Sequence, residues 1–297
     1  MLLKKILEYC NNDYINDEYI CKNCNHPKKC PGKCEECLRQ IHFKADEAGN
    51  RHSYDCKNLM DYYVCKYSFK YTSEMCYAFK EIRELVCKEK NLNVLSIGCG
   101  PCTDLFALDC MKKQGTYCYR EINYIGIDPL EKWERIHDFI KYNVNDINLC
   151  FKYKKIQKIL PKLFEKEFRS DIIIMNYLLS DFHKYQGSAE VIDFLNYLVY
   201  YIINVSPNAI IIINDINLDC SRGGGRDYYD ILFSKLRKYG FNCIRKHFKN
   251  NNKMYHFDYG QEYGKNELIF SNEFVSEYDD FNPYRSCASA QIIIYRE

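Results

Sequence analysis

Two glycines frame a cysteine in the segment VLSIGCGPCTDLFAL, residues 94–108, where a short apolar run ends and a helical pattern begins. A strand that turns sharply into a helix places backbone N–H groups at the carboxyl edge of a sheet, where open α/β folds bind ligands. Gly98 and Gly100 supply the dihedral angles that such a turn needs. The segment predicts a ligand-binding loop, and a strand-to-helix turn without a ligand is the alternative.

Asp128 is a second candidate, because it ends the apolar run YIGI, 28 residues after Gly100. A carboxylate at this place can accept hydrogen bonds from both hydroxyls of a ribose, or it can cap the following helix. A dinucleotide fits poorly, since residue 103 is threonine instead of the third glycine of G-x-G-x-x-G. Pro101 also removes one N–H from the loop. The two features together predict a nucleoside site that does not suit a pyrophosphate.

These residues make the chain resemble the class I S-adenosylmethionine-dependent methyltransferases. VLSIGCGP is similar to the first motif of that family and YIGIDP to the second, and the resemblance covers roughly residues 75–297. It implies that S-adenosylmethionine, a nucleoside without a phosphate, is the cofactor. The implied cofactor-binding residues are Ser96, Gly98, Cys99, Gly100, Asp104, Asp128, Pro129 and Asn176. The chain departs from the family pattern at Ser96, often an acid, and at Cys102, often a glycine.

The resemblance places the methyl acceptor at the end of the fourth strand, in IIIMNYLLSDFH, residues 172–183. Methyl transfer from a sulfonium requires a positioned nucleophile and, before or after transfer, a proton acceptor. Asn176, Tyr177 and Asp181 are the catalytic candidates. The alternative is that Asn176 caps the following helix and Asp181 is solvated.

Five cysteines lie within residues 21–37, although 18 cysteines among 297 residues would place about one there by chance. Two C-x2-C pairs are typical of tetrahedral metal sites. We expect structural zinc, bound by members of the set Cys21, Cys24, Cys30, Cys34 and Cys37, with His42 as a possible replacement. An iron–sulfur cluster is the alternative metal centre, and chance clustering is the other interpretation.

Short apolar runs alternate with helical patterns from residue 91 onward, which is typical of a parallel sheet with crossover helices. The strands are expected at residues 94–97, 124–127, 148–152, 171–175, 209–213, 242–248 and 290–295, and helices at 103–113, 132–141, 190–203 and 227–239. This predicts an α/β domain with a seven-stranded, mostly parallel Rossmann-like sheet and helices on both faces. By resemblance, the last strand is antiparallel and lies between the fifth and sixth.

The chain is expected to divide into a Cys-rich, partly helical N-terminal region, residues 1–90, and a cofactor-binding domain, residues 91–297. A near balance of 42 basic and 40 acidic residues is unlike a protein that coats nucleic acid. The absence of a secretory signal and of a membrane-length apolar run predicts a cytoplasmic protein with reduced thiols. The sequence does not predict an oligomeric state.

The resulting hypothesis is methyl transfer to a macromolecule, with RNA favoured over protein and the zinc module helping to bind the substrate. A small-molecule methyltransferase and a cofactor-binding assembly factor without turnover are the alternatives. Three glycines, residues 223–225, lie between Arg222 and Arg226 and form either a mobile basic loop or a plain connection. A positive groove that reaches these arginines would favour nucleic acid, and an enclosed pocket beside Asn176 would favour a small substrate.

Overall fold

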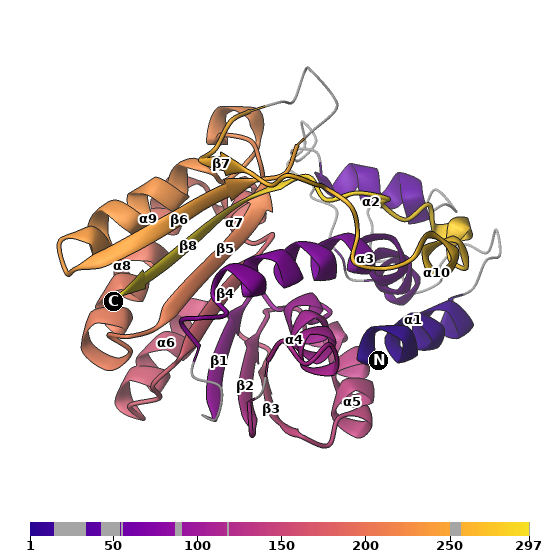
Figure 1. The fold of residues 1–297 in the computed structure, drawn as a ribbon, viewed down its shortest axis with the longest axis horizontal. Helices are drawn as coiled ribbons and strands as arrows, with labels where there is room; N and C mark the ends of the chain where they lie inside the picture. The colour runs from indigo at the N-terminus through magenta and orange to yellow at the C-terminus, as the bar shows by residue number, and fades with distance from the viewer. Residues whose placement is uncertain are drawn as a thin grey trace.

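The computed structural model describes residues 1–14, 34–42, 54, 56–86, 91–117, 119–249 and 257–296, without the side chains of residues 40 and 42. A single twisted sheet runs through the molecule, with helices on both of its faces (Figure 1). The strands are β1 (Leu92–Ile97), β2 (Ile122–Ile127), β3 (Ile147–Lys152), β4 (Ile172–Asn176), β5 (Ile210–Ile216), β6 (Phe241–His247), β7 (Gln261–Glu262) and β8 (Ser289–Arg296).

The helices include all four that periodicity predicts after residue 91. They are α1 (Leu2–Asp13), α2 (Cys34–His42), α3 (Lys57–Glu81), α4 (Thr103–Lys113), α5 (Glu134–Asn143), α6 (Ile156–Glu165), α7 (Leu179–Gln186), α8 (Ser188–Val205), α9 (Asp227–Arg237) and α10 (Asn272–Ser276). Within the described residues, none of these helices combines the length and apolar character that crossing a membrane requires.

The strand order is β3-β2-β1-β4-β5-β8-β6-β7. Strands β1 to β5 pair in parallel, whereas β8 runs antiparallel to both of its neighbours, β5 and β6. The expected antiparallel last strand is therefore confirmed. The expected number of strands is wrong by one, because β7 adds a two-residue pairing to the edge of β6. Two exposed residues, Gln261 and Glu262, carry no apolar pattern that could have predicted this strand.

The central strands are apolar without alternation because both faces of the sheet are covered. Ile172 and Ile174 of β4 pack into the core that contains α1, α3, α4 and α5. Ile173 and Met175 point to the other side, where α6, α7, α8 and α9 cover the sheet. The run DIIIM therefore fills two cores at once.

The N-terminal helices belong to the first of these cores. α3 packs along α4 and is also in contact with α1, α2, β5 and β8. Twenty of its 25 residues are buried, so its sequence lacks the one-sided apolar stripe of a surface helix. This position brings α3 to the carboxyl ends of β4 and β5, where the candidate site lies.

Candidate functional site

The turn between β1 and α4 contains three residues with positive φ. The angle is 69° at Gly98, 46° at Gly100 and 68° at Cys102. A Cβ atom on Gly98 would lie 2.7 Å from Cδ1 of Leu178, so the end of that side chain would have to shift, and the positive φ would strain any larger residue. The backbone path of this turn therefore requires glycine at position 98.

The backbone amides of the turn bond within the protein. The N–H groups of Gly98 and Cys99 both donate to the carbonyl oxygen of Ile127, at 2.7 and 3.1 Å. The N–H group of Cys102 donates to the carbonyl oxygen of Cys99 at 2.7 Å, and Pro101 has no N–H. These residues leave few donors for a phosphate, so the loop fits a nucleoside without a phosphate better than a dinucleotide.

Asp128 holds the turn from the end of β2. Its Oδ2 accepts a hydrogen bond from the N–H of Gly100 at 3.0 Å, and its Oδ1 accepts one from Leu130 at 2.9 Å. Burial raises the pKa of Asp128 to about 6, although both backbone hydrogen bonds act to lower it. Each carboxylate oxygen keeps acceptor capacity. Asp128 can therefore bind two ribose hydroxyls while it fixes the loop.

Asp104, in the first turn of α4, is a second buried acid beside the loop. Its two carboxylate oxygens lie 3.1 and 3.2 Å from the hydroxyl of Tyr124, which donates to them. Burial raises the pKa of Asp104 to about 7, and Cys102 adds to this, while hydrogen bonds from Ser96 and Tyr124 lower it. A carboxyl group thus lies beside Ser96, where the family pattern often has an acid on β1 itself.

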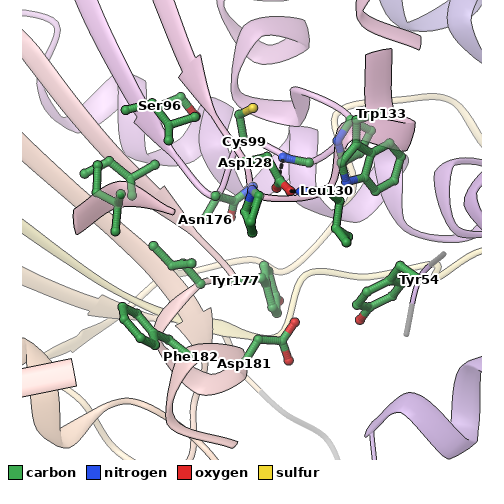
Figure 2. Close-up of a pocket in the computed structure, with 18 of the residues that line it drawn as sticks. Tyr54, Ser96, Cys99, Asp128, Leu130, Trp133, Asn176, Tyr177, Asp181 and Phe182 are labelled. Atoms are coloured by element: carbon green, nitrogen blue, oxygen red, sulfur yellow. Dashed lines mark hydrogen bonds between the residues drawn. The ribbon is translucent and has the colours of Figure 1, made fainter. Parts of the chain in front are cut away.

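These residues line a cavity of about 360 Å³ at the carboxyl ends of the strands (Figure 2). All the sequence-predicted cofactor and catalytic residues contribute to its wall: Ser96, Gly98, Cys99, Gly100, Asp104, Asp128, Pro129, Asn176, Tyr177 and Asp181. Sequence reasoning missed other lining residues: Tyr54, Tyr63, Tyr71, Leu130, Trp133, Ile156, Phe182 and Tyr185. The fold brings the predicted cofactor loop and the predicted acceptor segment into one space.

Asn176, at the end of β4, is fixed by two hydrogen bonds. Its Nδ2 donates to Oγ1 of Thr103 at 2.9 Å, and its Oδ1 accepts from Nδ2 of Asn214 at 2.7 Å. These bonds join β4 to the turn after β1 and to β5. Helix α7 begins after Leu178 without a side-chain cap. Asn176 therefore does not cap this helix, which removes the alternative interpretation of that residue.

Tyr177 follows directly, with a φ of 53°. Its hydroxyl donates to Oε2 of Glu74 at 3.0 Å, and its ring stacks on that of Tyr71 with 3.8 Å between the centroids. The hydroxyl is therefore engaged with α3, and the ring is the part of Tyr177 that lines the cavity.

Asp181 lies in the first turn of α7, with a side chain that is 33% exposed. In Figure 2 its carboxylate points into the space between Tyr177 and Tyr54. Burial raises the pKa of Asp181 to about 6, the nearby charge of Lys184 lowers it, and that of Asp215 raises it. A carboxylate in this state can accept a proton near neutral pH.

Two tyrosines of α3, Tyr63 and Tyr71, supply a further wall of the cavity. Tyr63, Tyr67 and Tyr71 follow one another at four-residue spacing and therefore lie on one face of the helix. The ring of Tyr63 is 6.3 Å from that of Tyr71 and 6.1 Å from that of Trp133. The four-residue spacing could have indicated a helix face made of tyrosines. In a chain with 28 tyrosines, however, such a spacing can also result from composition alone.

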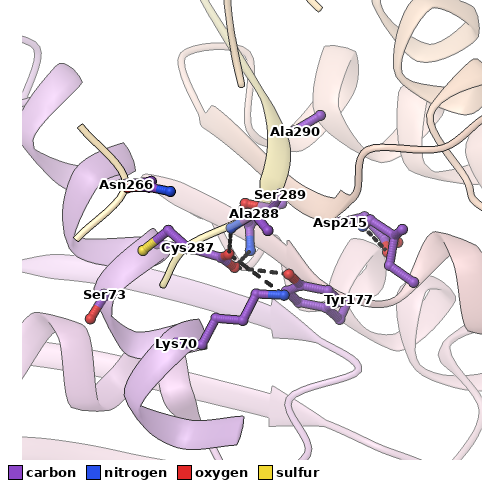
Figure 3. Close-up of polar contacts among 12 residues, drawn as sticks. Lys70, Ser73, Tyr177, Asp215, Asn266, Cys287, Ala288, Ser289 and Ala290 are labelled. Atoms are coloured by element: carbon purple, nitrogen blue, oxygen red, sulfur yellow. Dashed lines mark hydrogen bonds and ion pairs between the residues drawn. The ribbon is translucent and has the colours of Figure 1, made fainter. Parts of the chain in front are cut away.

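Glu74 joins α3 to the sheet below the cavity. Besides Tyr177, it accepts hydrogen bonds from Nδ2 of Asn214 at 3.1 Å and from the N–H of Ala288 at 2.9 Å. Its side chain is fully buried, and Nζ of Lys70 lies 3.9 Å away. Figure 3 shows Lys70, Tyr177 and Ala288 converging on this cluster. Helix α3 therefore helps to position the end of β4.

Cys99, Cys102 and His137 form a buried group beside the turn, with ligand atoms within 4.8 Å of one another. Nε2 of His137 lies 2.7 Å from the carbonyl oxygen of Gly100, and Nδ1 lies 3.0 Å from the hydroxyl of Tyr153. Both ring nitrogens thus have hydrogen-bond partners. This arrangement fits a histidine that supports the loop better than one that binds a metal ion.

The predicted metal ligands are described only in part, because Cys21, Cys24 and Cys30 lie outside the described residues. Cys34 and Cys37 lie one turn apart on α2, where Cys37 is buried. The metal centre remains a prediction from the sequence.

The two arginines around the glycine run contact their own loop and the segment that contains Phe257 and Tyr259. Nη1 of Arg226 donates to Oδ1 of Asn217 at 2.8 Å, and its guanidinium lies over the rings of Phe257 and Tyr259. Arg222 also lies over Phe257, at 4.3 Å from the ring centroid. Neither arginine lines the cavity.

Comparisons with protein-family models and with curated proteins find no match. Among solved structures, the chain is similar to the plantazolicin methyltransferase BpumL in complex with SAH, at 15% identity and a TM-score of 0.43, over 89% of this chain and 99% of that one. A SAM-dependent methyltransferase from Archaeoglobus fulgidus is similar at 17% identity and a TM-score of 0.37, over 75% and 94%. An rRNA methylase from Streptococcus thermophilus is similar at 8% identity and a TM-score of 0.40, over 74% and 94%.

The topology of the sheet decides the fold. Five parallel strands in the order β3-β2-β1-β4-β5 are followed by an antiparallel β8 that lies between β5 and β6. The chain has the class I methyltransferase fold. In such a fold the ligand binds at the carboxyl ends of the strands on either side of β1, which is where the cavity lies.

Proposed function

We propose that the protein transfers a methyl group from S-adenosylmethionine to a small acceptor, or to a small side group, that enters the cavity beside Asn176. The observation that carries this proposal is that the turn after β1, the carboxylate of Asp128 and the end of β4 all line the same cavity. The engaged amides of the turn support a cofactor without phosphate.

Each part of the cavity has a separate role in this proposal. Asp128 binds the ribose, and the turn around Gly98 and Gly100 packs against the amino-acid part of the cofactor. The cofactor supplies an activated methyl group on a sulfonium. Asn176 joins the end of β4 to Thr103 and Asn214 and so fixes the backbone beside the acceptor. The walls of the cavity exclude water from the reacting atoms.

A small acceptor is favoured over RNA, which the sequence hypothesis preferred. The described part of the chain forms a partly open pocket of about 360 Å³ beside Asn176. Arg222 and Arg226, by contrast, lie on Phe257 outside the cavity. Three acids, Asp104, Asp128 and Asp181, line this pocket against two lysines, Lys154 and Lys155, so its acidic side is unsuited to a phosphate backbone.

Calorimetric titration with S-adenosylmethionine tests the cofactor, and a labelled-methyl assay on metabolite, RNA and protein fractions of the host tests the acceptor. Asp128→Ala should weaken cofactor binding by about 1–3 kcal/mol, the usual cost of losing hydrogen bonds to a charged group. Asp138→Asn, at an exposed acid of α5, is the control and should leave affinity unchanged. Unchanged affinity in the Asp128 variant would remove this residue from the site. Tight cofactor binding without transfer to any fraction would favour the assembly-factor alternative.

A further inference from the structure

The acceptor end of the cavity has walls made of tyrosine rings. Tyr54 and Tyr63 meet edge to face at 5.3 Å, and Tyr71 stacks on Tyr177. These residues come from three separate parts of the chain: Tyr54 precedes α3, Tyr63 and Tyr71 belong to α3, and Tyr177 follows β4. Ring faces present partial negative charge, so such a wall attracts cations.

Asp181 adds a full negative charge at the same place (Figure 2). The one ion pair found for it within the described residues is long, with Oδ1 3.8 Å from Nζ of Lys184. No residue donates a hydrogen bond to its carboxylate at close range in the described part of the chain, unlike Asp128 and Asp215, which each accept backbone N–H groups. A ligand can therefore reach its oxygens.

Two lysines line the other end of the cavity, whereas Lys184, the ion-pair partner of Asp181, and Lys70, 5.2 Å from the ring centroid of Tyr177, lie near the acceptor end without lining it. The two lysines among the described lining residues, Lys154 and Lys155, follow β3. In the sheet, β3 and β4 lie on opposite sides of β1, so these lysines are separated from the acceptor end by the cofactor region. The acceptor end thus combines ring faces with one accessible carboxylate.

Building on the proposed function, we propose that the acceptor is an amine, bound as its ammonium ion by Asp181 and the rings of Tyr54 and Tyr63. A phenol or alcohol could donate one hydrogen bond to the carboxylate, but it carries no positive charge for the carboxylate or the ring faces to attract. A phosphate-bearing substrate would be repelled by Asp181. The ammonium ion is the group that uses both.

Asp181 also provides the proton acceptor that an ammonium ion needs before it can react. The carboxylate takes one N–H proton, which frees the lone pair of the nitrogen. The nitrogen then forms its bond to the methyl carbon, while the carbon–sulfur bond breaks and its electron pair leaves with the sulfur of a neutral thioether. The product is a methylated ammonium ion, and Asp181 returns its proton to water.

The ionisation of Asp181 should govern amine binding. The charged groups that bear on it are Lys184 on its own helix, Asp215 at the end of β5 and Asp128 at the end of β2. The uncharged tyrosines that it affects in turn are Tyr54, Tyr63 and Tyr67. Since its pKa is about 6, the carboxylate is ionised above that pH and protonated below it. Affinity for an ammonium ion should therefore fall as the pH decreases through about 6.

The test is calorimetric titration of the full chain saturated with S-adenosylhomocysteine, using three amine and alcohol pairs: phenethylamine and 2-phenylethanol, tyramine and tyrosol, and butylamine and butanol. We expect at least one amine to bind ten times more tightly than its alcohol. Asp181→Asn should remove this preference and leave affinity for S-adenosylhomocysteine unchanged. Asp138→Asn, an exposed acid paired with Lys141, should keep the preference.

Lys184→Met supplies a second, independent variant, because it removes the cation that competes for Asp181. It should raise amine affinity two- to tenfold. The proposal is overturned if S-adenosylhomocysteine binds but no amine exceeds its alcohol, if the preference survives in Asp181→Asn, or if an RNA oligonucleotide binds and the amines do not. Failure of S-adenosylhomocysteine itself to bind would instead refute the proposed function on which this inference rests.

Discussion

Replacing Glu74 with glutamine should destabilise the protein far more than its conservative chemistry suggests. Three donors point at the two oxygens of this fully buried carboxylate: Tyr177 and Asn214 at Oε2, and the N–H of Ala288 at Oε1. An amide has one acceptor oxygen, so in either orientation its NH2 group faces at least one of these donors. The size of the side chain is unchanged, so no cavity forms.

The expected loss of folding stability follows from the number of donors left without an acceptor. One buried donor without an acceptor costs about 1–3 kcal/mol, so Glu74→Gln should lower the free energy of unfolding by about that amount. Glu74→Ala leaves Lys70 and all three donors without their partner, and it should cost about 3–5 kcal/mol. Both values are a large share of the stability of a typical domain.

Urea unfolding, followed by circular dichroism, measures these differences. Glu81→Gln is the matched control, because Glu81 ends the same helix, is 28% exposed and pairs with Lys246 at 3.4 Å. Its loss should cost no more than about 1 kcal/mol. A double-mutant cycle of Glu74→Gln with Tyr177→Phe should show a coupling energy of about 0.5–1.5 kcal/mol. If Glu74→Gln is no less stable than Glu81→Gln, the buried network does not join α3 to the sheet as argued.

Three further predictions concern the loop, the acid and the cysteines. Gly98→Ala should weaken S-adenosylhomocysteine binding at least tenfold in calorimetry, because the new methyl group, 2.7 Å from Cδ1 of Leu178, would displace a side chain that lines the cavity; Gly115→Ala, also at positive φ but with no atom within 4 Å, should not. Amine affinity should fall more steeply as the pH decreases below 6 in the wild type than in Asp181→Asn, where only Asp104 and Asp128 still titrate in the cavity, and equal profiles would exclude Asp181. The double serine variant of Cys21 and Cys24 should lose bound zinc in elemental analysis, and full retention of the metal would refute that ligand set.

Much of the candidate site could be predicted because its signals are local. Gly98, Gly100 and Asp128 lie at the ends of apolar runs, and the carboxyl ends of neighbouring parallel strands meet at one edge of a sheet. The strands themselves were found because burial on both faces makes runs such as DIIIM continuously apolar. The two-residue β7 could not be found in this way, since both of its side chains are exposed.

The N-terminal contribution to the site could not be read from the sequence. Tyr63, Tyr71 and Glu74 line or support the cavity about 100 residues before the segment that they contact, and nothing local indicates which residues α3 will meet. A glutamate in a helical run is usually solvated, but Glu74 is buried, and three donors surround it: one from the residue after β4, one from β5 and one from the segment before β8. Only packing reveals this.

The sequence by itself determined the α/β class, the turn after β1 and the acid after β2, because each depends on residues that are close together in the chain. The tertiary structure decided what faces the end of β4: a wall of tyrosines and one accessible carboxylate, Asp181. The physical reason is that backbone conformation and burial leave a periodic trace in the sequence. The partners of a side chain, in contrast, depend on which distant elements the fold brings beside it.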